Sequence, residues 1–113
     1  KIGDIYYISA KIDGQNMEGL RNMVDQIRDR LKSGIVALAT VQDGKVQFAA
    51  GATKDAVKYG VHVGKILNEI AKITEGGGGG RPDMAQAGGR NVNKVEEALE
   101  QVAILLARQL GIK

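Results

Sequence analysis

Residues 35–50 read IVALATVQDGKVQFAA, and this stretch decides the fold. Its first half, residues 35–42, is apolar almost throughout, which is typical of a central strand covered on both faces. Asp43-Gly44 follows as a two-residue turn whose central positions both need a positive φ. Residues 45–50 then return as a second strand. The sequence therefore predicts a β-hairpin at the centre of a sheet.

The residues before this hairpin predict a strand and a helix. Residues 5–12 (IYYISAKI) are rich in β-branched and aromatic residues and precede a turn signal, so they are expected to form a strand. Asn16 can cap a helix that runs to about Lys32, because apolar residues recur there at three- and four-residue steps. Ser33-Gly34 would supply a left-handed stop for this helix. Its apolar side should pack on the sheet.

The residues after the hairpin predict two more helices with a glycine-rich loop between them. From about Val63 to Thr74 the apolar residues follow helical spacing. Gly76 to Gly80 are five consecutive glycines, which have no side chains for ordinary packing, so a loop is expected. A long amphipathic helix closes the chain, and Asn93 with Glu96 fits a reciprocal cap at its start.

The predicted fold class is α/β, a small mixed β-sheet flanked by helices in the order β-α-β-β-α-Gly loop-α. A chain of 113 residues supports one hydrophobic core, so residues 1–113 are interpreted as a single domain. The sequence starts at Lys1 rather than Met and runs directly into a strand. We therefore expect it to be a piece of a longer polypeptide.

Composition excludes several classes of chemistry. The chain has no Cys and one His, so thiol catalysis, disulfides and Cys- or His-rich metal sites are ruled out. No apolar run approaches the roughly 20 residues that span a bilayer, and no signal-peptide pattern opens the chain, so we expect a cytoplasmic protein without membrane contact. His62 has no serine or cysteine partner nearby and is interpreted as a surface or helix-start histidine.

Positive charge is concentrated in the middle of the chain. The net charge is +3, but the stretch from Lys45 to Lys94 contains eight basic and four acidic residues, while the rest of the chain carries a net −1. A polyanion would therefore prefer the middle. Tyr59, which follows Lys58 in this stretch, is a candidate for stacking on a nucleic-acid base.

The glycine run has two interpretations. A flexible linker would be expected between domains and mixed with Ser, whereas here an Arg-Pro-Asp segment follows the glycines. Alternatively, the bare backbone lets a phosphate approach closely, and its N–H groups face the anion together with the positive end of a short helix starting at Pro82. Arg81 would add a planar donor. The spacing fits neither the ATP nor the NAD phosphate-binding loop.

The segment Gly77–Gly89, GGGGRPDMAQAGG, resembles a motif near the C-terminus of alanyl-tRNA synthetases. The similarity extends upstream through residues 36–39, 43–46 and 51–55. In the family these segments correspond to a strand, to a turn followed by a second strand, and to a Thr/Ser-Lys-Asp loop. It extends downstream to the closing helix. The resemblance implies the C-terminal globular domain of those enzymes, a DHHA1-type (C-Ala) domain.

In that family the domain holds the outer corner of L-shaped tRNA, where the D and T loops meet, and supports aminoacylation and editing. The resemblance implies that this domain is not catalytic and carries no cofactor, whereas its parent uses ATP, magnesium and zinc. The implied partners are alanine-specific tRNA and the catalytic and editing domains of the same chain. The fragment itself is expected to be a monomer.

Charge and position in the motif together predict the residues that contact nucleic acid. They are Lys45, Lys54, Lys58, Lys65, Gly77, Gly78, Gly79, Gly80, Arg81, Asp83, Gln86, Gly88, Gly89 and Arg90.

Two alternatives stay open. The family is also related to the substrate-binding domain of DHH phosphoesterases, where a Gly-Gly-Gly-His motif holds nucleotide phosphates; here Arg81-Pro82 stands in place of that His. Such a domain would bind a mononucleotide or dinucleotide in preference to folded tRNA. In the second alternative the last helix docks a partner helix or a second copy, because residues 102–106 are more apolar than one stripe requires.

Overall fold

The computed structural model describes residues 2–111, so the two ends of the predicted 1–113 domain lie outside the described residues. The strands are β1 (Tyr6–Lys11), β2 (Gly34–Gln42), β3 (Lys45–Ala52), β4 (Gly77–Gly80) and β5 (Met84–Gly89). The helices are α1 (Met17–Arg28), α2 (Lys54–Lys58), α3 (Val63–Ile73) and α4 (Val95–Gln109), and a short 3-10 helix, η1 (Val92–Lys94), leads into α4.

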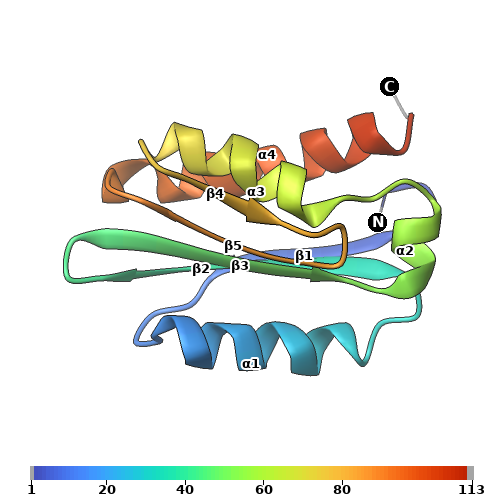
Figure 1. Cartoon of the computed structure of the whole chain (residues 1–113), viewed down its shortest axis with the longest axis horizontal. Helices are drawn as coiled ribbons and strands as arrows, with labels where there is room; N and C mark the ends of the chain where they lie inside the picture. Colours follow the sequence, from blue (N-terminus) through green and yellow to red (C-terminus); the bar gives the residue numbers. More distant parts are fainter. Residues whose placement is uncertain (1, 112–113) are drawn as a thin grey trace.

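The strands form one five-stranded sheet in the order β1-β2-β3-β5-β4. β1 runs parallel to β2, and the other neighbours are antiparallel, so the sheet is mixed as predicted. Helix α1 lies on one side of the sheet, and α3 and α4 lie on the other (Figure 1). The predicted α/β class is therefore confirmed, with two more strands and one more helix than the sequence predicted.

The central hairpin forms as predicted. Asp43 and Gly44 have φ values of 53° and 74°, the positive values that this turn requires. Side chains of β2 alternate between the two faces, so Ile35 packs toward α3 and α4 while Val36 packs toward α1. This alternation explains why β2 is apolar at almost every position.

The hydrophobic core has one part on each face of the sheet. Beneath α1 it consists of Leu20, Val24, Val36, Leu38 and Ala49. Between the sheet and the other two long helices its largest buried side chains are Ile5, Ile35, Val46, Phe48, Ile66, Leu67, Ile70 and Leu106. Each such side chain contributes about 1.5–3 kcal/mol when it is buried, so both helical layers are firmly attached.

Helix α1 begins as predicted but ends earlier. The Asn16 side chain accepts a hydrogen bond from the N–H of Gly19 at 2.8 Å, whereas the last helical residue is Arg28. The predicted left-handed stop at Ser33-Gly34 is wrong, because Gly34 is the first residue of β2. A Cβ on Gly34 would lie 2.8 Å from the carbonyl oxygen of Tyr6, so the glycine serves the close start of the β1–β2 pair.

Four of the five consecutive glycines form a strand. The prediction of a loop there is therefore wrong, and so is the interpretation as a flexible linker. Gly77–Gly80 form β4, the edge strand, which pairs antiparallel with β5. No helix starts at Pro82, because Pro82 and Asp83 form the turn between these strands and Arg81 N–H donates to the Met84 carbonyl at 2.9 Å. Gly78, Gly79 and Gly80 have φ values of 148°, 149° and 158°, which residues with side chains rarely adopt.

The packing of α3 explains why β4 consists of glycine. A Cβ on Gly64 would lie 2.7 Å from the carbonyl carbon of Gly80 and 2.9 Å from its nitrogen, so helix backbone touches strand backbone. The N–H groups of Val63 and Gly64 donate to the carbonyls of Pro82 and Arg81 at 3.0 and 3.2 Å. The Asn68 amide also donates to the Gly78 carbonyl at 2.9 Å. Helix α3 therefore covers the outer edge of β4.

Two local predictions near α2 and α4 are also wrong. The residues predicted as a Thr-Lys-Asp loop are not a loop: Thr53 caps α2, and Lys54 and Asp55 are the first two residues of that helix. The predicted cap of the last helix by Asn93 does not form, because η1 occupies that position and Asn91 accepts a hydrogen bond from Asn93 N–H at 3.1 Å. α4 then begins without a side-chain cap.

Most of the apolar surplus in α4 is used by the core. Val102 and Leu106 are fully buried, and Leu105 packs against the same cluster, which leaves Ile104 exposed at 46%. Within residues 2–111 no helix combines the length and hydrophobicity needed to cross a bilayer.

We predict that Gly64→Ala destabilises the fold, although alanine is normally the better helix former by about 1 kcal/mol. The new methyl group would overlap the backbone of Gly80, which cannot move without breaking the β4–β5 pairing. A net loss of roughly 2 kcal/mol is expected, measured as the free energy of unfolding in urea. Gly77→Ala is the control, because its Cβ would meet nothing within 4 Å. Stabilisation by Gly64→Ala would contradict the close contact.

Candidate nucleic-acid interface

The predicted cations lie at two opposite ends of the sheet. β3 has eight residues and is therefore roughly 25 Å long. Lys45 lies at its start, at the same end as Arg90, because Val46 pairs with Gly89 across β3 and β5. Lys54 follows the other end of β3. The predicted residues therefore do not form one cluster.

One of these ends gathers basic side chains from three elements, and we name it the basic end. Lys54 and Lys58 come from α2, Lys65 from the first turn of α3, and Arg81 from the β4–β5 turn. The Ala52 N–H donates to the Asp83 carbonyl at 3.0 Å, which fixes this turn beside the end of β3. Residues distant in sequence are thereby held in one region.

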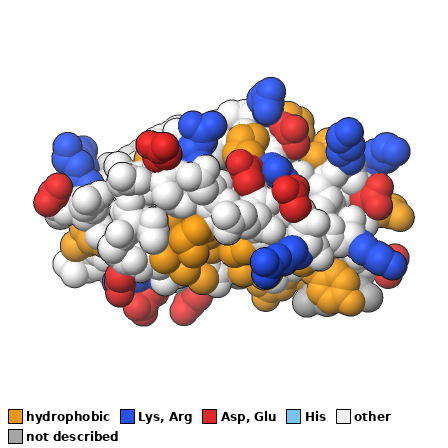
Figure 2. All heavy atoms as spheres, turned by 90° about the horizontal axis from the view of Figure 1, so that it is seen from below, with side chains coloured by type: hydrophobic (Ala, Val, Ile, Leu, Met, Phe, Trp, Pro, Cys, Tyr) orange, Lys and Arg blue, Asp and Glu red, His pale blue; other side chains and the backbone are white. Residues whose placement is uncertain are grey.

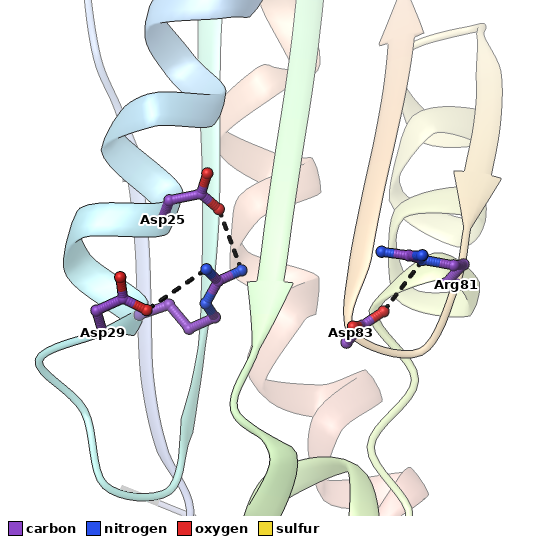
Figure 3. Close-up of polar contacts among 5 residues, drawn as sticks. Asp25, Asp29, Arg81 and Asp83 are labelled. Carbon is purple, nitrogen blue, oxygen red and sulfur yellow. Dashed lines mark hydrogen bonds and ion pairs between the residues drawn. The ribbon is translucent and has the colours of Figure 1, made fainter.

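The lysines of the basic end are available to a ligand. Within residues 2–111 no carboxylate lies within 4 Å of the amino group of Lys54, Lys58 or Lys65. Arg81 is paired, with Nε 3.3 Å from Oδ1 of Asp83, but both side chains are largely exposed (Figure 3). An exposed pair of this kind is worth less than about 1 kcal/mol, so a phosphate can displace Asp83 from Arg81.

The structure adds two basic residues that the sequence did not predict. Arg28 and Lys32 line a hollow of about 520 Å³ at the basic end, together with Thr53, Lys54 and Asp55. Residues 1–44 contain six basic and six acidic residues, so the charge of that part of the chain gave no signal for them. Only the packing of α1 against the end of β3 brings them beside α2.

Arg28 is held in a structural ion-pair network. Its Nη1 lies 3.1 Å from Oδ1 of Asp25, and its Nη2 lies 3.4 Å from Oδ1 of Asp29 (Figure 3). The side chain lies over Gly51, where a Cβ would be 3.5 Å from Nη1. Arg28 therefore has its charge balanced by its own helix, unlike the exposed lysines of α2.

Exposed glycine backbone adjoins Lys65. A hollow of about 490 Å³ lies between α3 and β4, lined by Gly64, Lys65, Asn68, Glu69 and Gly78–Gly80. The start of α3 does not offer free N–H groups to an anion there, because Val63, Gly64 and Lys65 donate to Pro82, Arg81 and the Nδ1 of His62. What remains for a polyanion is the side-chain-free strand beside the Lys65 ammonium.

His62 starts α3, as predicted. Its Nδ1 accepts a hydrogen bond from Lys65 N–H at 3.1 Å. Its backbone N–H and carbonyl are both bonded to the side-chain amide of Gln109, at 2.9 and 3.0 Å. Tyr59 is 61% exposed beside Lys58, so its ring is accessible for stacking. Within residues 2–111 no three carboxylate or imidazole groups converge where a metal ion could bind.

The remaining predicted residues lie along β5 and beyond it. Gly89 serves packing, because its Cβ would lie 2.6 Å from the Cβ of Thr74. Arg90 donates from Nε to the carbonyl of Glu75 at 3.5 Å, and its N–H donates to the Thr74 carbonyl at 2.7 Å. Gln86 lies near Arg21 of α1. These residues therefore lie apart from the basic end.

Thr53 positions α2 and its two lysines. Its Oγ1 accepts hydrogen bonds from Ala56 N–H at 3.2 Å and from Gly34 N–H at 3.1 Å. Its own N–H donates to the Gly34 carbonyl at 3.0 Å. One hydroxyl group thus caps α2 and joins it to the start of β2.

Comparison with known proteins gives consistent matches. The sequence matches the DHHA1 domain family over residues 4–108. It is 49% identical over 111 residues to the alanine–tRNA ligases of Roseiflexus sp. (strain RS-1) and of Acetivibrio thermocellus, covering 98% of this chain in both cases. The chain covers only 12% and 13% of the length of these relatives.

The structure is similar to the crystal structure of the C-Ala domain from Aquifex aeolicus alanyl-tRNA synthetase. The TM-score is 0.83 with 32% sequence identity, over 98% of this chain and 96% of that one. A pGpG-specific phosphodiesterase, PggH from Vibrio cholerae, has a TM-score of 0.53 with 13% identity, over 92% of this chain and 35% of that one. The second likeness shows a shared fold alone.

We predict that Thr53→Ala destabilises the chain by about 1–2 kcal/mol, because the helix cap and the Gly34 bond are both lost. The free energy of unfolding in urea measures the effect. Thr53→Ser keeps the oxygen and should lose less than half as much. If the serine variant is as unstable as the alanine variant, the hydroxyl bonds are not what holds α2.

Proposed function

This chain belongs to the DHHA1 domain family, as a C-Ala domain of the alanyl-tRNA synthetase type, and from that premise we propose that it binds tRNA. The proposed target is the outer corner of the L-shaped molecule, where the D and T loops meet. Recognition there depends on the shape of the RNA backbone, which cationic side chains contact through phosphates.

The observation that carries this proposal is the basic end. Lys54, Lys58 and Lys65 project there without carboxylate partners within residues 2–111, and Lys65 adjoins the bare glycine backbone of β4. A strand without side chains lets a phosphate chain approach the backbone closely. Arg81 adds a planar donor at the tip of the same hairpin. Tyr59 is exposed there and offers a ring for base stacking.

The role of the domain follows from that of its parent, which we propose to be an alanine–tRNA ligase. Relatives of that name are about eight times longer than this chain, and we propose that catalysis belongs to other parts of the polypeptide. ATP, magnesium and zinc would be bound there. This domain would hold alanine tRNA during both aminoacylation and editing, without performing a chemical step.

A second candidate function is binding of a dinucleotide, which the fold shared with the phosphodiesterase suggests. The hollow between α3 and β4 is lined by glycine backbone and Lys65, which suits a small phosphate ester. Arg81-Pro82 follows the glycines where the phosphoesterases have a histidine. This departure favours the tRNA proposal, and direct comparison of the two ligands distinguishes them.

We predict that the chain binds alanine tRNA with a strong dependence on salt. If roughly three to five phosphates are neutralised, the logarithm of the association constant should fall against the logarithm of salt concentration with a slope of about −2 to −5. Filter binding at several salt concentrations measures this slope. A transcript without its D arm should bind more weakly. Preference for a dinucleotide such as pGpG over intact tRNA would overturn the proposal.

We further predict that the lysines of α2 contribute more to binding than other lysines do. The double variant Lys54→Ala/Lys58→Ala should weaken tRNA binding and reduce the magnitude of the salt slope by about 2. The control is Lys72→Ala/Lys94→Ala, which removes the same charge from lysines paired with Glu69 and Glu97 at 3.6 and 4.0 Å. Equal effects of the two double variants would mean that only net charge matters.

A further inference from the structure

One face of β5 lies outside the core and carries one polar side chain, that of Gln86. Ala85 and Ala87 point into the core below α3 and α4, so Gln86 points to the opposite face, on the side of α1. On that side α1 packs on β2 and β3, and its cluster does not include β5. Figure 2, seen from the α1 side, shows a broad area of backbone and uncharged polar groups there, with charged side chains around it.

Arg21 of α1 and Gln86 of β5 meet on this face. When the Gln86 amide is oriented with its oxygen toward α1, that oxygen accepts bonds from Nε and Nη1 of Arg21 at 3.1 and 3.2 Å. This orientation turns the Nε2 amino group of Gln86 away from Arg21. Arg21 is exposed, and within residues 2–111 no carboxylate pairs with it within 4 Å. The pair is therefore locked by internal bonds but keeps free donors.

The pair keeps free N–H donors on two flat groups, while the Gln86 oxygen accepts from Arg21. The guanidinium group has five N–H donors, of which two serve Gln86, and the amide amino group has two donors. Both groups are flat, and their bonds to each other fix them in place. Among the major-groove edges of paired bases, only that of guanine presents two adjacent acceptors, N7 and O6.

We propose that Arg21, held by Gln86, reads the N7 and O6 acceptors of a guanine base in the bound RNA. This inference rests on the proposed function, because it names a base contact within the same complex. The neighbouring backbone leaves room for a base, because Gly88 follows Gln86 by two residues on the same strand and has no side chain to block the approach on that face.

The charges around Arg21 favour a neutral base over a phosphate. A small hollow of about 180 Å³ is lined by Glu18, Arg21, Asn22 and Asp25, so two carboxylates lie beside the guanidinium group. Asp25 is already paired with Arg28, so Glu18 is the carboxylate that would repel a phosphate more than a guanine edge. At the basic end, by contrast, basic side chains outnumber acidic ones, because Lys32, Lys54, Lys58, Lys65 and Arg81 lie there with Asp29, Asp55 and Asp83. We therefore assign the phosphate contacts to the basic end and the recognition of the base to Arg21.

The test compares two versions of the alanine tRNA transcript, one ordinary and one with every guanosine replaced by 7-deazaguanosine, which lacks the N7 acceptor. The unmodified 113-residue chain should bind the ordinary transcript at least about fivefold more tightly, the loss expected when one bond of a good base contact is removed. Arg21→Lys keeps the charge but loses the planar donor pair, so its preference should fall below about twofold with an unchanged salt slope.

Two further variants make the result specific. Gln86→Ala should also reduce the preference, because the guanidinium group is then no longer fixed. Arg30→Lys changes another exposed arginine, which lies beyond the end of α1, and should keep the full preference. Circular dichroism melting checks that the variants and both transcripts are folded.

The other outcomes overturn the inference in distinguishable ways. If Arg21→Lys retains the preference for the ordinary transcript while Arg21→Ala reduces the magnitude of the salt slope by about 1, Arg21 contacts a phosphate and no guanine edge. If the unmodified chain binds alanine tRNA without any preference between the two transcripts, the base contact alone is wrong. If it binds neither transcript, the proposed function fails together with this inference.

Discussion

The contact between the backbone of α3 and the backbone of β4 is the constraint on which the rest of the structure depends. Gly64 and Gly80 approach so closely that a methyl group on Gly64 would overlap the strand. This approach allows the N–H groups of Val63 and Gly64 to donate to the hairpin at Pro82 and Arg81. A run of glycine is a poor strand by intrinsic preference, so the helix must hold it in place.

This contact also places the proposed tRNA surface. An uncovered edge strand exposes unpaired N–H and carbonyl groups, but here α3 covers the edge, with Asn68 bonded to Gly78. The tip of the hairpin is then fixed between α3 and the end of β3, where Ala52 donates to Asp83. Arg81 and Lys65 are consequently held beside the lysines of α2. Because β4 has no side chains, α3 can pack closely against it, and part of its backbone still lines the hollow beside Lys65.

The surroundings of each cation separate structural charges from charges available to a ligand. Arg28 is half-buried between Asp25 and Asp29, so its charge is balanced within α1. Lys54 and Lys58 are exposed on a short helix that Thr53 attaches to β2. Arg21 lies between these extremes, because it is fixed by a neutral amide and flanked by carboxylates. Phosphate contacts contribute mainly to affinity and base contacts to sequence specificity. In our proposal the two kinds of contact are made by different surfaces of the domain.

By itself the sequence determined what local chemistry can specify. The apolar run before Asp43-Gly44 predicted the central hairpin, helical spacing predicted the three longer helices, and the motif at residues 77–89 predicted the family. Periodicity and turn preference act over a few residues, and consecutive glycines show no hydrophobic periodicity and favour turns or loops, so β4 could not be recognised as a strand. Only the tertiary structure decided that Gly64 packs on Gly80, that the predicted cations divide between two ends of the sheet, and that Arg21 meets Gln86. Each of these depends on contacts between residues far apart in the chain, which no local pattern encodes.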